Sequence, residues 1–340
     1  MEEIAEKKIK EVHRDKQSTY IPPKRCIQEN FYSDIIDGLS YNPKKLPSKY
    51  FYDEKGDQLF QQIMSMPEYY LTRCELDIFS NKTSELATGI ISDSEQPFDL
   101  IELGAGDAMK SSFLLKYLVR EDMDFRYIPI DISGNILSIL NDNLRKDIPD
   151  LDIVPLEGEY FDMLEKANSL SKRKKIVLLL GSNIGNMERD EIHDFFKQLN
   201  AKLNKGDIIV IGFDLKKNPS IILNAYNDRT GITAAFNLNL LTRINRELGA
   251  DFDLRQFQHY QNYDPISGAC RSYLVSLKDQ KVTFGNQTIN FRENEPIEME
   301  ISQKFSLPEI EHFAQYAGFD TITKITDAQK WFVDAVWQVK

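Results

Sequence analysis

The sequence predicts an α/β fold built on a doubly wound, mostly parallel sheet. From about residue 98 onward, compact apolar stretches alternate with segments whose apolar residues recur at helical spacing. The stretch 176–180 is Ile-Val-Leu-Leu-Leu, without polar alternation, which is typical of a central strand buried on both faces. Strands that alternate with helices in this way predict parallel pairing with right-handed crossovers.

The expected strands and helices of this core follow one another with short connections. We expect strands at 98–103, 126–130, 152–156, 176–180 and 207–212. We expect helices at 110–118, 133–144 and 189–203. Ser133 is the expected N-cap of the second helix, because a serine side chain can accept a hydrogen bond from the first free backbone N–H groups.

Beyond the fifth strand the pattern changes. A long Asn-rich helical region is expected at 220–248, and apolar residues then alternate with polar ones at 271–275 and 297–301, which indicates antiparallel sheet. A helix at 307–317, capped by Ser306 with Pro308 in its first turn, and a strand at 331–339 close the chain. We therefore expect two parts, a core formed by 66–214 and 303–340 and a second lobe formed by 1–65 and 215–302.

Composition narrows the classes of partner. The formal net charge of −11 argues against a nucleic-acid binder, which must neutralise phosphates with Lys and Arg. The three cysteines, Cys26, Cys74 and Cys270, lie far apart and show neither a disulfide framework nor a metal-binding spacing. The charged segment 1–16 is unlike a signal peptide, and the apolar runs are too short to cross a bilayer. We expect a cytoplasmic protein without a metal, a nucleic acid or a membrane as partner.

A glycine turn is the first candidate for a binding site. Gly104 and Gly106 follow an expected strand and precede an expected helix. Glycines allow the backbone to turn tightly and to approach a ligand closely. Asp131 ends the next strand, where a carboxylate can accept both hydrogen bonds of a ribose diol. The turn and the acid together predict a site for a cofactor that contains a nucleoside.

Two cofactors remain open at this point, a nicotinamide dinucleotide and S-adenosylmethionine. A dinucleotide turn has a third glycine where this chain has the bulky Met109. An acidic rim at Glu102 suits the cationic sulfonium and amino group of S-adenosylmethionine, and Lys110 can pair with its methionyl carboxylate. Glu159 and Tyr160 follow the third strand, where they can meet the base. The residues favour S-adenosylmethionine and leave a nicotinamide-dependent oxidoreductase as an alternative.

The turn is one of several motifs along the chain. They lie at 49–56, 67–73, 102–110, 180–186, 234–237, 243–248 and 300–305. With these motifs the chain, from about residue 46 to its C-terminus, resembles the histidine-specific S-adenosylmethionine-dependent methyltransferases, the histidine Nα-methyltransferases of ergothioneine biosynthesis. The resemblance implies a Rossmann-like class I methyltransferase core with a second, substrate-binding lobe formed by the N-terminal segment and an insertion after strand five.

The resemblance also implies roles for single residues. The residues expected to bind the cofactor are Gly104, Gly106, Lys110, Asp131, Glu159 and Tyr160. Those expected to bind the substrate are Tyr52, Phe60, Tyr69, Gly181, Asn186, Tyr226, Ser272, Glu300 and Ser302. Among these, Asn186 and Tyr226 would hold the amino-acid carboxylate, whereas Tyr69, Glu300 and Ser302 would read the imidazole. Tyr52 and Asn186 would position the reacting amine, and no residue is assigned as general base.

The implied reaction is methyl transfer to the α-amine of L-histidine, up to the trimethyl betaine. Ser272 stands where the family commonly has an apolar Met near the substrate ring, which leaves another aromatic amino acid such as tryptophan as an alternative acceptor. Glu300 favours histidine, because an indole offers no acceptor nitrogen and gains little from a buried carboxylate. A regulatory module that keeps the cofactor fold without turnover is the alternative from a different class.

Overall fold

A seven-stranded sheet forms the centre of the computed structural model, which describes residues 24–91 and 96–340. Its order is β12-β13-β6-β5-β2-β3-β4. The strands are β2 (Phe98–Leu103), β3 (Phe125–Asp131), β4 (Leu156–Glu157), β5 (Lys174–Leu179), β6 (Ile208–Asp214), β12 (Phe319–Thr326) and β13 (Phe332–Val339). The strands from β2 to β6 pair in parallel, and β13 and β12 add an antiparallel edge. The predicted doubly wound α/β fold is confirmed.

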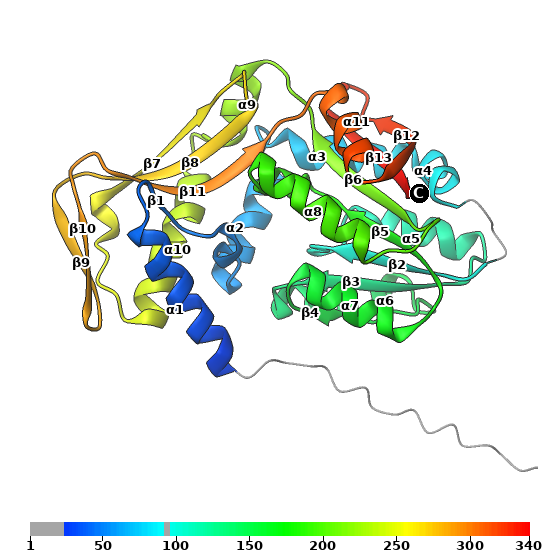
Figure 1. Ribbon diagram of the computed structural model, residues 1–340, viewed down its shortest axis with the longest axis horizontal. Helices are drawn as coiled ribbons and strands as arrows, with labels where there is room; N and C mark the ends of the chain where they lie inside the picture. The colour runs from blue at the N-terminus through cyan, green and yellow to red at the C-terminus, as the bar shows by residue number, and fades with distance from the viewer. Residues whose placement is uncertain (1–23, 92–95) are drawn as a thin grey trace, which may run out of the picture.

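Helices cover both faces of this sheet (Figure 1). One face packs against α3 (Tyr70–Asn81), α4 (Thr83–Ile90), α5 (Ser111–Arg120) and α6 (Gly134–Asp147). The other face packs against α7 (Tyr160–Leu170), α8 (Arg189–Ala201) and α11 (Leu307–Tyr316). Strand β5 contributes Ile176 and Leu178 to the first apolar layer and Val177 and Leu179 to the second. The expectation that this strand is buried on both faces is therefore confirmed.

Two predicted helix starts are also confirmed. The Ser133 hydroxyl accepts a hydrogen bond from the backbone N–H of Ile136 at the start of α6. Ser306 and Glu309 form a capping box at the start of α11. The Ser306 side chain accepts from the backbone N–H of Glu309, and the Glu309 side chain accepts from the backbone N–H of Ser306. These short-range bonds satisfy donors that a helix leaves free at its first turn.

Two expected elements differ from the structure, and one strand was not expected. In the expected strand 152–156, Ile153 forms an isolated bridge to Tyr127 of β3, and regular pairing with β3 begins only at Leu156, the first residue of β4. The region 220–248 is divided into α9 (Pro219–Ala225) and α10 (Ile232–Leu248). The division arises because Asp228 accepts hydrogen bonds from two backbone N–H groups of a new first turn, next to a left-handed Gly231. Strand β12, at the sheet edge, was absent from the prediction because only Phe319, Ile322 and Ile325 in it are apolar, and their spacing of three does not fit the alternation of a strand.

A second, smaller sheet lies to one side of the first (Figure 1). Its order is β1-β11-β8-β7, with β1 (Lys44–Lys45), β7 (Phe257–Tyr263), β8 (Ala269–Ser276) and β11 (Pro296–Gln303). The hairpin of β9 (Gln280–Phe284) and β10 (Gln287–Phe291) extends it, and α1 (Lys24–Ser40), α2 (Glu54–Ser65) and α10 complete this part. The antiparallel pairing of β8 with β11 confirms the predicted sheet.

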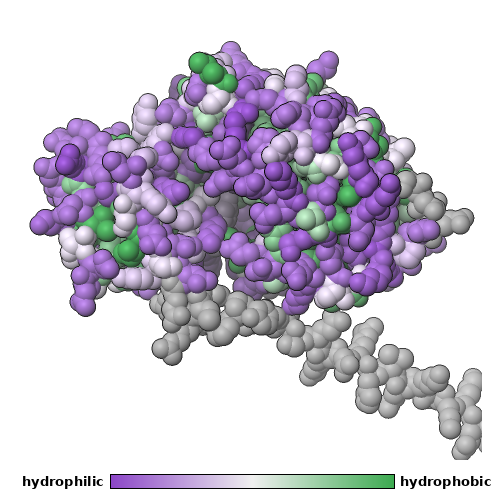
Figure 2. Space-filling view, in the orientation of Figure 1, coloured by the Kyte–Doolittle hydropathy of each residue, from purple (hydrophilic) through white to green (hydrophobic). Residues whose placement is uncertain are grey.

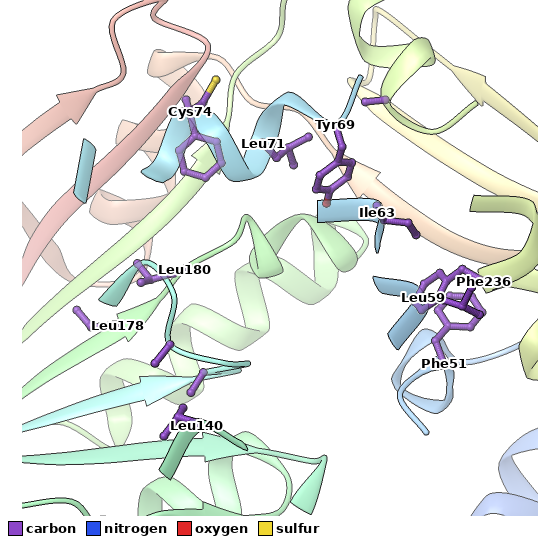
Figure 3. Close-up of a cluster of buried hydrophobic side chains, with 14 of the residues drawn as sticks. Phe51, Leu59, Ile63, Tyr69, Leu71, Cys74, Leu140, Leu178, Leu180 and Phe236 are labelled. Atoms are coloured by element: carbon purple, nitrogen blue, oxygen red, sulfur yellow. The ribbon is translucent and has the colours of Figure 1, made fainter. Parts of the chain in front are cut away.

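The surface seen in Figure 2 is mainly hydrophilic over both parts. The large apolar side chains instead meet inside, as Figure 3 shows for Leu178 and Leu180 of the central sheet region and for Phe51, Leu59 and Phe236 of the smaller part. No helix within the described ranges combines the length and the apolar character that a membrane crossing requires.

Candidate active site

A cavity of about 350 Å³ opens at the carboxyl ends of the parallel strands. This is the edge at which open α/β sheets bind their ligands. Most of the predicted site residues line it, namely Tyr52, Phe60, Tyr69, Gly104, Gly106, Lys110, Asp131, Glu159, Tyr160, Gly181 and Asn186. The remaining four, Tyr226, Ser272, Glu300 and Ser302, lie beyond the aromatic side chains described below.

The glycine turn after β2 favours glycine at two positions for different reasons. Gly104 has φ 71°, and a Cβ there would lie 2.7 Å from the Tyr160 hydroxyl and 2.6 Å from Asn183 Nδ2. Gly106 has φ 55° and open space around it, so only its backbone conformation favours glycine. The turn therefore exposes backbone rather than side chains to the cavity.

Asp131, at the end of β3, organises this turn. One carboxylate oxygen accepts from the backbone N–H of Gly106 at 3.0 Å, and the other accepts from the backbone N–H of Ser133 at 3.0 Å. Burial raises the pKa of Asp131, and the nearby charge of Asp57 raises it further. Asp57 also lines the cavity and accepts from the Ser133 hydroxyl at 2.7 Å. Each carboxylate oxygen keeps further lone pairs, so Asp131 can still accept from a ribose diol.

Lys110 lies at the cavity wall in an ion pair with Glu75, which the sequence analysis did not identify. Glu75 is wholly buried on α3 and accepts from the backbone N–H of Gly181 at 2.9 and 2.8 Å. Gly212 leaves the space that this carboxylate occupies, because a Cβ there would collide with it. Asp334 is buried beside the pair, and burial together with the charge of Glu75 holds its pKa well above the usual range.

The expected acidic rim at Glu102 is wrong. Glu102 is only 2% exposed, and the Tyr127 hydroxyl donates a hydrogen bond to it. Burial raises the pKa of Glu102 to about 7. The alternation of β2 turns this side chain into the packed interior, so it does not face the cavity.

The edge of the cavity next to β4 carries Glu159 and Tyr160, as expected. Glu159 lies 3.3 Å from the Lys49 ammonium, which belongs to the smaller part of the molecule and also lines the cavity. Burial raises the pKa of Tyr160, whose ring lies against Gly104. An aromatic ring beside a carboxylate suits an adenine with its exocyclic amino group.

An aromatic wall, formed by Tyr52, Phe60 and Tyr69 and continued by Tyr226, closes the cavity on the side opposite Glu159 and Tyr160. The ring centroids of Tyr52 and Phe60 are 5.6 Å apart, those of Phe60 and Tyr69 are 6.5 Å apart, and those of Tyr69 and Tyr226 are 6.0 Å apart. In Figure 3, Tyr69 leaves the start of α3 close to Ile63 of α2. The wall therefore joins the cavity to Tyr226, although Tyr52 precedes α2, Phe60 lies within it, Tyr69 precedes α3 and Tyr226 follows α9.

Glu300 and Ser302 project from β11 behind this wall. Ser302 Oγ lies 2.7 Å from the Tyr226 hydroxyl, and Glu300 pairs across the sheet with the buried Ser272 of β8. Burial raises the pKa of Glu300 to about 7. Burial and then the Glu300 charge hold the pKa of Tyr52 well above its usual range.

Asn186 ends a 3-10 helix (Asn183–Asn186) that follows β5. The loop begins at Gly181 and Ser182, which both adopt left-handed backbone conformations. Gly185 packs against the backbone of Gln303, where a Cβ would lie 3.0 Å from the carbonyl oxygen. The loop is thereby held between the cofactor turn and β11, with Asn186 at the cavity.

The residues that line the cavity fit the groups of S-adenosylmethionine. A ribose diol can meet Asp131, an adenine can meet Glu159 and Tyr160, and the methionyl carboxylate can meet Lys110. Met109 lines the cavity where a dinucleotide turn would have its third glycine. The fold and these groups define an S-adenosylmethionine-dependent methyltransferase of class I.

Comparison with known proteins specifies the family. The family model described as "Histidine-specific methyltransferase, SAM-dependent" matches residues 31–339, and the chain belongs to this family. The nicotinamide-dependent alternative is thereby set aside. Histidine N-alpha-methyltransferase of Mycobacterium tuberculosis is 33% identical over 296 residues, which cover 86% of this chain and 90% of that protein.

Two further proteins are similar to this chain, one over part of its own length and the other at low sequence identity. Ergothioneine biosynthesis protein 1 of Schizosaccharomyces pombe is 29% identical over 287 residues, which cover 82% of this chain and 37% of that protein. The crystal structure of the glycopeptide N-methyltransferase MtfA with S-adenosyl-L-homocysteine covers 77% of this chain and 87% of that chain, with a TM-score of 0.39 and 11% identity.

Proposed function

We propose that this enzyme transfers the methyl group of S-adenosylmethionine to the α-amine of L-histidine and repeats the transfer up to the trimethyl betaine. The observation that carries the substrate is the position of Glu300 and Ser302 two residues apart on β11, with Ser302 hydrogen-bonded to Tyr226 at the end of the aromatic wall. A carboxylate that accepts and a hydroxyl that can donate match the two nitrogens of a neutral imidazole. The relatives named as histidine N-alpha-methyltransferases support the same acceptor.

The side chains position the amine rather than remove its proton. When bound, the cofactor supplies a methyl group that is already activated, so orientation and electrostatics are the main tasks of the protein. Burial and the Glu300 charge hold the pKa of Tyr52 well above its usual range, and burial and Tyr226 do so for Tyr69. Both hydroxyls therefore stay protonated and can orient the nitrogen but not act as bases. The proton leaves to water.

Asn186→Ala should weaken histidine capture while cofactor binding persists. The amide is expected to hold the amino-acid carboxylate, and loss of a hydrogen bond to a charged group should weaken histidine binding about 10- to 100-fold. Calorimetry of histidine binding in the presence of S-adenosylhomocysteine measures this change. An unchanged histidine affinity would refute the role of Asn186.

The acceptor itself is tested by incubation with S-adenosylmethionine and each amino acid, followed by mass spectrometry. Histidine should gain methyl groups in single steps up to three, the number that a trimethyl betaine carries. A product from tryptophan instead would make the alternative aromatic acceptor correct. No methylated product from any amino acid would favour a regulatory module.

We also propose the division of the chain into a cofactor core (66–214 and 303–340) and a substrate-binding lobe (1–65 and 215–302). Its support is that the seven-stranded sheet uses only strands from the first set, whereas β1, β7 and β8 come from the second. Residues 1–23 of the lobe lie outside the described residues.

Two further properties bear on the substrate and the location. The net charge of −11 supports a small-molecule substrate over a nucleic acid. The free, buried Cys74 and Cys270 support a cytoplasmic location.

A further inference from the structure

Lys304 lies directly beyond β11 with a wholly buried side chain. Its ammonium donates to the Tyr226 hydroxyl at 2.8 Å and to Ser302 Oγ at 2.8 Å. It also forms an ion pair with Asp214 Oδ2 at 2.8 Å. Tyr226 and Ser302 keep 7% and 5% of their surface exposed, whereas Lys304 and Asp214 have none. The lysine can therefore affect a ligand only through the two hydroxyls.

A count of hydrogens shows what the lysine does to these hydroxyls. An ammonium has three hydrogens, and the three contacts of Lys304 use all of them. Both hydroxyl oxygens thus accept from Lys304, and they lie 2.7 Å from each other. Only one hydrogen fits between them, so the second hydroxyl hydrogen has to point away from the lysine.

We propose that Lys304 is a positioning residue, which keeps one hydroxyl hydrogen of the Tyr226–Ser302 pair directed at the amino-acid substrate. The inference rests on the proposed function, in which these two residues meet the carboxylate and the imidazole. With the lysine in place, the pair offers a hydrogen-bond donor to an acceptor atom. A carboxylate oxygen and an unprotonated imidazole nitrogen are both acceptors.

Without the lysine, the same hydrogen has a competing acceptor inside the protein. Asp214 Oδ2 and the Tyr226 hydroxyl each lie 2.8 Å from the same Lys304 nitrogen, so the two oxygens are near neighbours. Burial and then the charge of Asp214 hold the pKa of Tyr226 well above its usual range. Once Lys304 no longer occupies Asp214 Oδ2, the spare hydrogen can turn towards the carboxylate. The substrate would then face oxygen lone pairs instead of a donor.

Lys304→Met should still fold, because Asp214 keeps other partners. Lys217 pairs with its second oxygen, and the Tyr70 hydroxyl donates to Oδ2 at 2.7 Å. Lys217→Met is the matched control. Lys217 bonds to Asp214, to the Tyr70 hydroxyl at 3.0 Å and to the Leu215 carbonyl at 2.6 Å, so its removal alters the same carboxylate without touching the hydroxyl pair.

The experiment compares the wild type, Lys304→Met and Lys217→Met in histidine KM, kcat, S-adenosylhomocysteine affinity and unfolding temperature. Lys304→Met should raise the histidine KM about 10- to 100-fold, the loss expected for one hydrogen bond to a charged or strongly polar group. Its kcat should change less than its KM, and its S-adenosylhomocysteine affinity should stay as in the wild type. Lys217→Met should keep the wild-type KM.

Two results would overturn the proposal. One is an unchanged histidine KM in Lys304→Met, and the other is an equal rise in both variants, which would assign the effect to Asp214 and general packing. Failure of the proposed function is a separate result, because the wild type would then not methylate histidine. In that case the same KM comparison with the acceptor that is methylated still decides the role of Lys304, since every amino acid brings a carboxylate.

Discussion

Glu300→Gln should cost the enzyme its histidine activity and at the same time make the ligand-free protein more resistant to unfolding above pH 7. The stability effect follows from the pKa of Glu300, which burial raises to about 7. A carboxyl group with a raised pKa in the folded state is disfavoured when it ionises, so it lowers stability progressively as pH rises from its unfolded value through 7. Glutamine carries no charge, and the gain in unfolding temperature should therefore appear at pH 8 and vanish below pH 4.

The loss of activity follows from the imidazole. A site built to pair with a polar group of its substrate rejects the unpaired alternative by large factors, and histidine kcat/KM should fall at least about 100-fold in Glu300→Gln. Glu298→Gln is the control, because Glu298 lies on the same strand and should change neither stability nor selectivity in this way. Assays of kcat/KM and thermal unfolding at the two pH values measure both effects. Retained histidine activity in Glu300→Gln would contradict the assignment of the imidazole site.

The parts of the fold that the sequence predicts well depend on neighbours along the chain. The apolar run of β5 identifies a strand from the sequence alone, because every one of its central residues is buried and therefore apolar. Ser133 and Ser306 mark helix starts because a cap acts within three residues. By contrast, the break between α9 and α10 depends on one side chain, Asp228, which accepts from the backbone N–H groups of the next helix. The spacing of apolar residues does not indicate that hydrogen bond.

The parts of the site that the sequence did not predict are charged groups without a local motif. Glu75 lies in a helix of ordinary composition, and only the fold brings it to Lys110 and to the N–H of Gly181. Asp214 ends β6 and Lys304 follows β11. They meet only because the residues after these two strands form a bridge, Leu215 to Phe305. Such pairs need the tertiary structure, since a charged residue alone is most often a solvated one. Lys110, to which the sequence analysis gave only the methionyl carboxylate as a partner, is for this reason already paired with Glu75.

Lys110→Met should lose cofactor binding and stability together. Its ammonium is the group expected to pair with the methionyl carboxylate, and it also neutralises Glu75, whose side chain is 1% exposed. Removing one partner of a buried ion pair leaves the other charge uncompensated and typically costs about 3–5 kcal/mol. Burial and then the charge of Glu75 hold the pKa of the neighbouring Asp334 well above its usual range, so a second negative charge is disfavoured there. Urea unfolding and S-adenosylhomocysteine titration measure the two losses.

A double variant separates the two roles of Lys110. Lys110→Met with Glu75→Gln removes both charges, and the amide oxygen can still accept from Gly181 N–H, so most of the stability should return. Cofactor affinity should not return, because the cation is still missing. Lys116→Met, on the same helix, breaks an exposed pair with Asp147 and should cost less than about 1 kcal/mol. If the double variant bound S-adenosylhomocysteine like the wild type, Lys110 would be a structural partner of Glu75 and not a cofactor ligand.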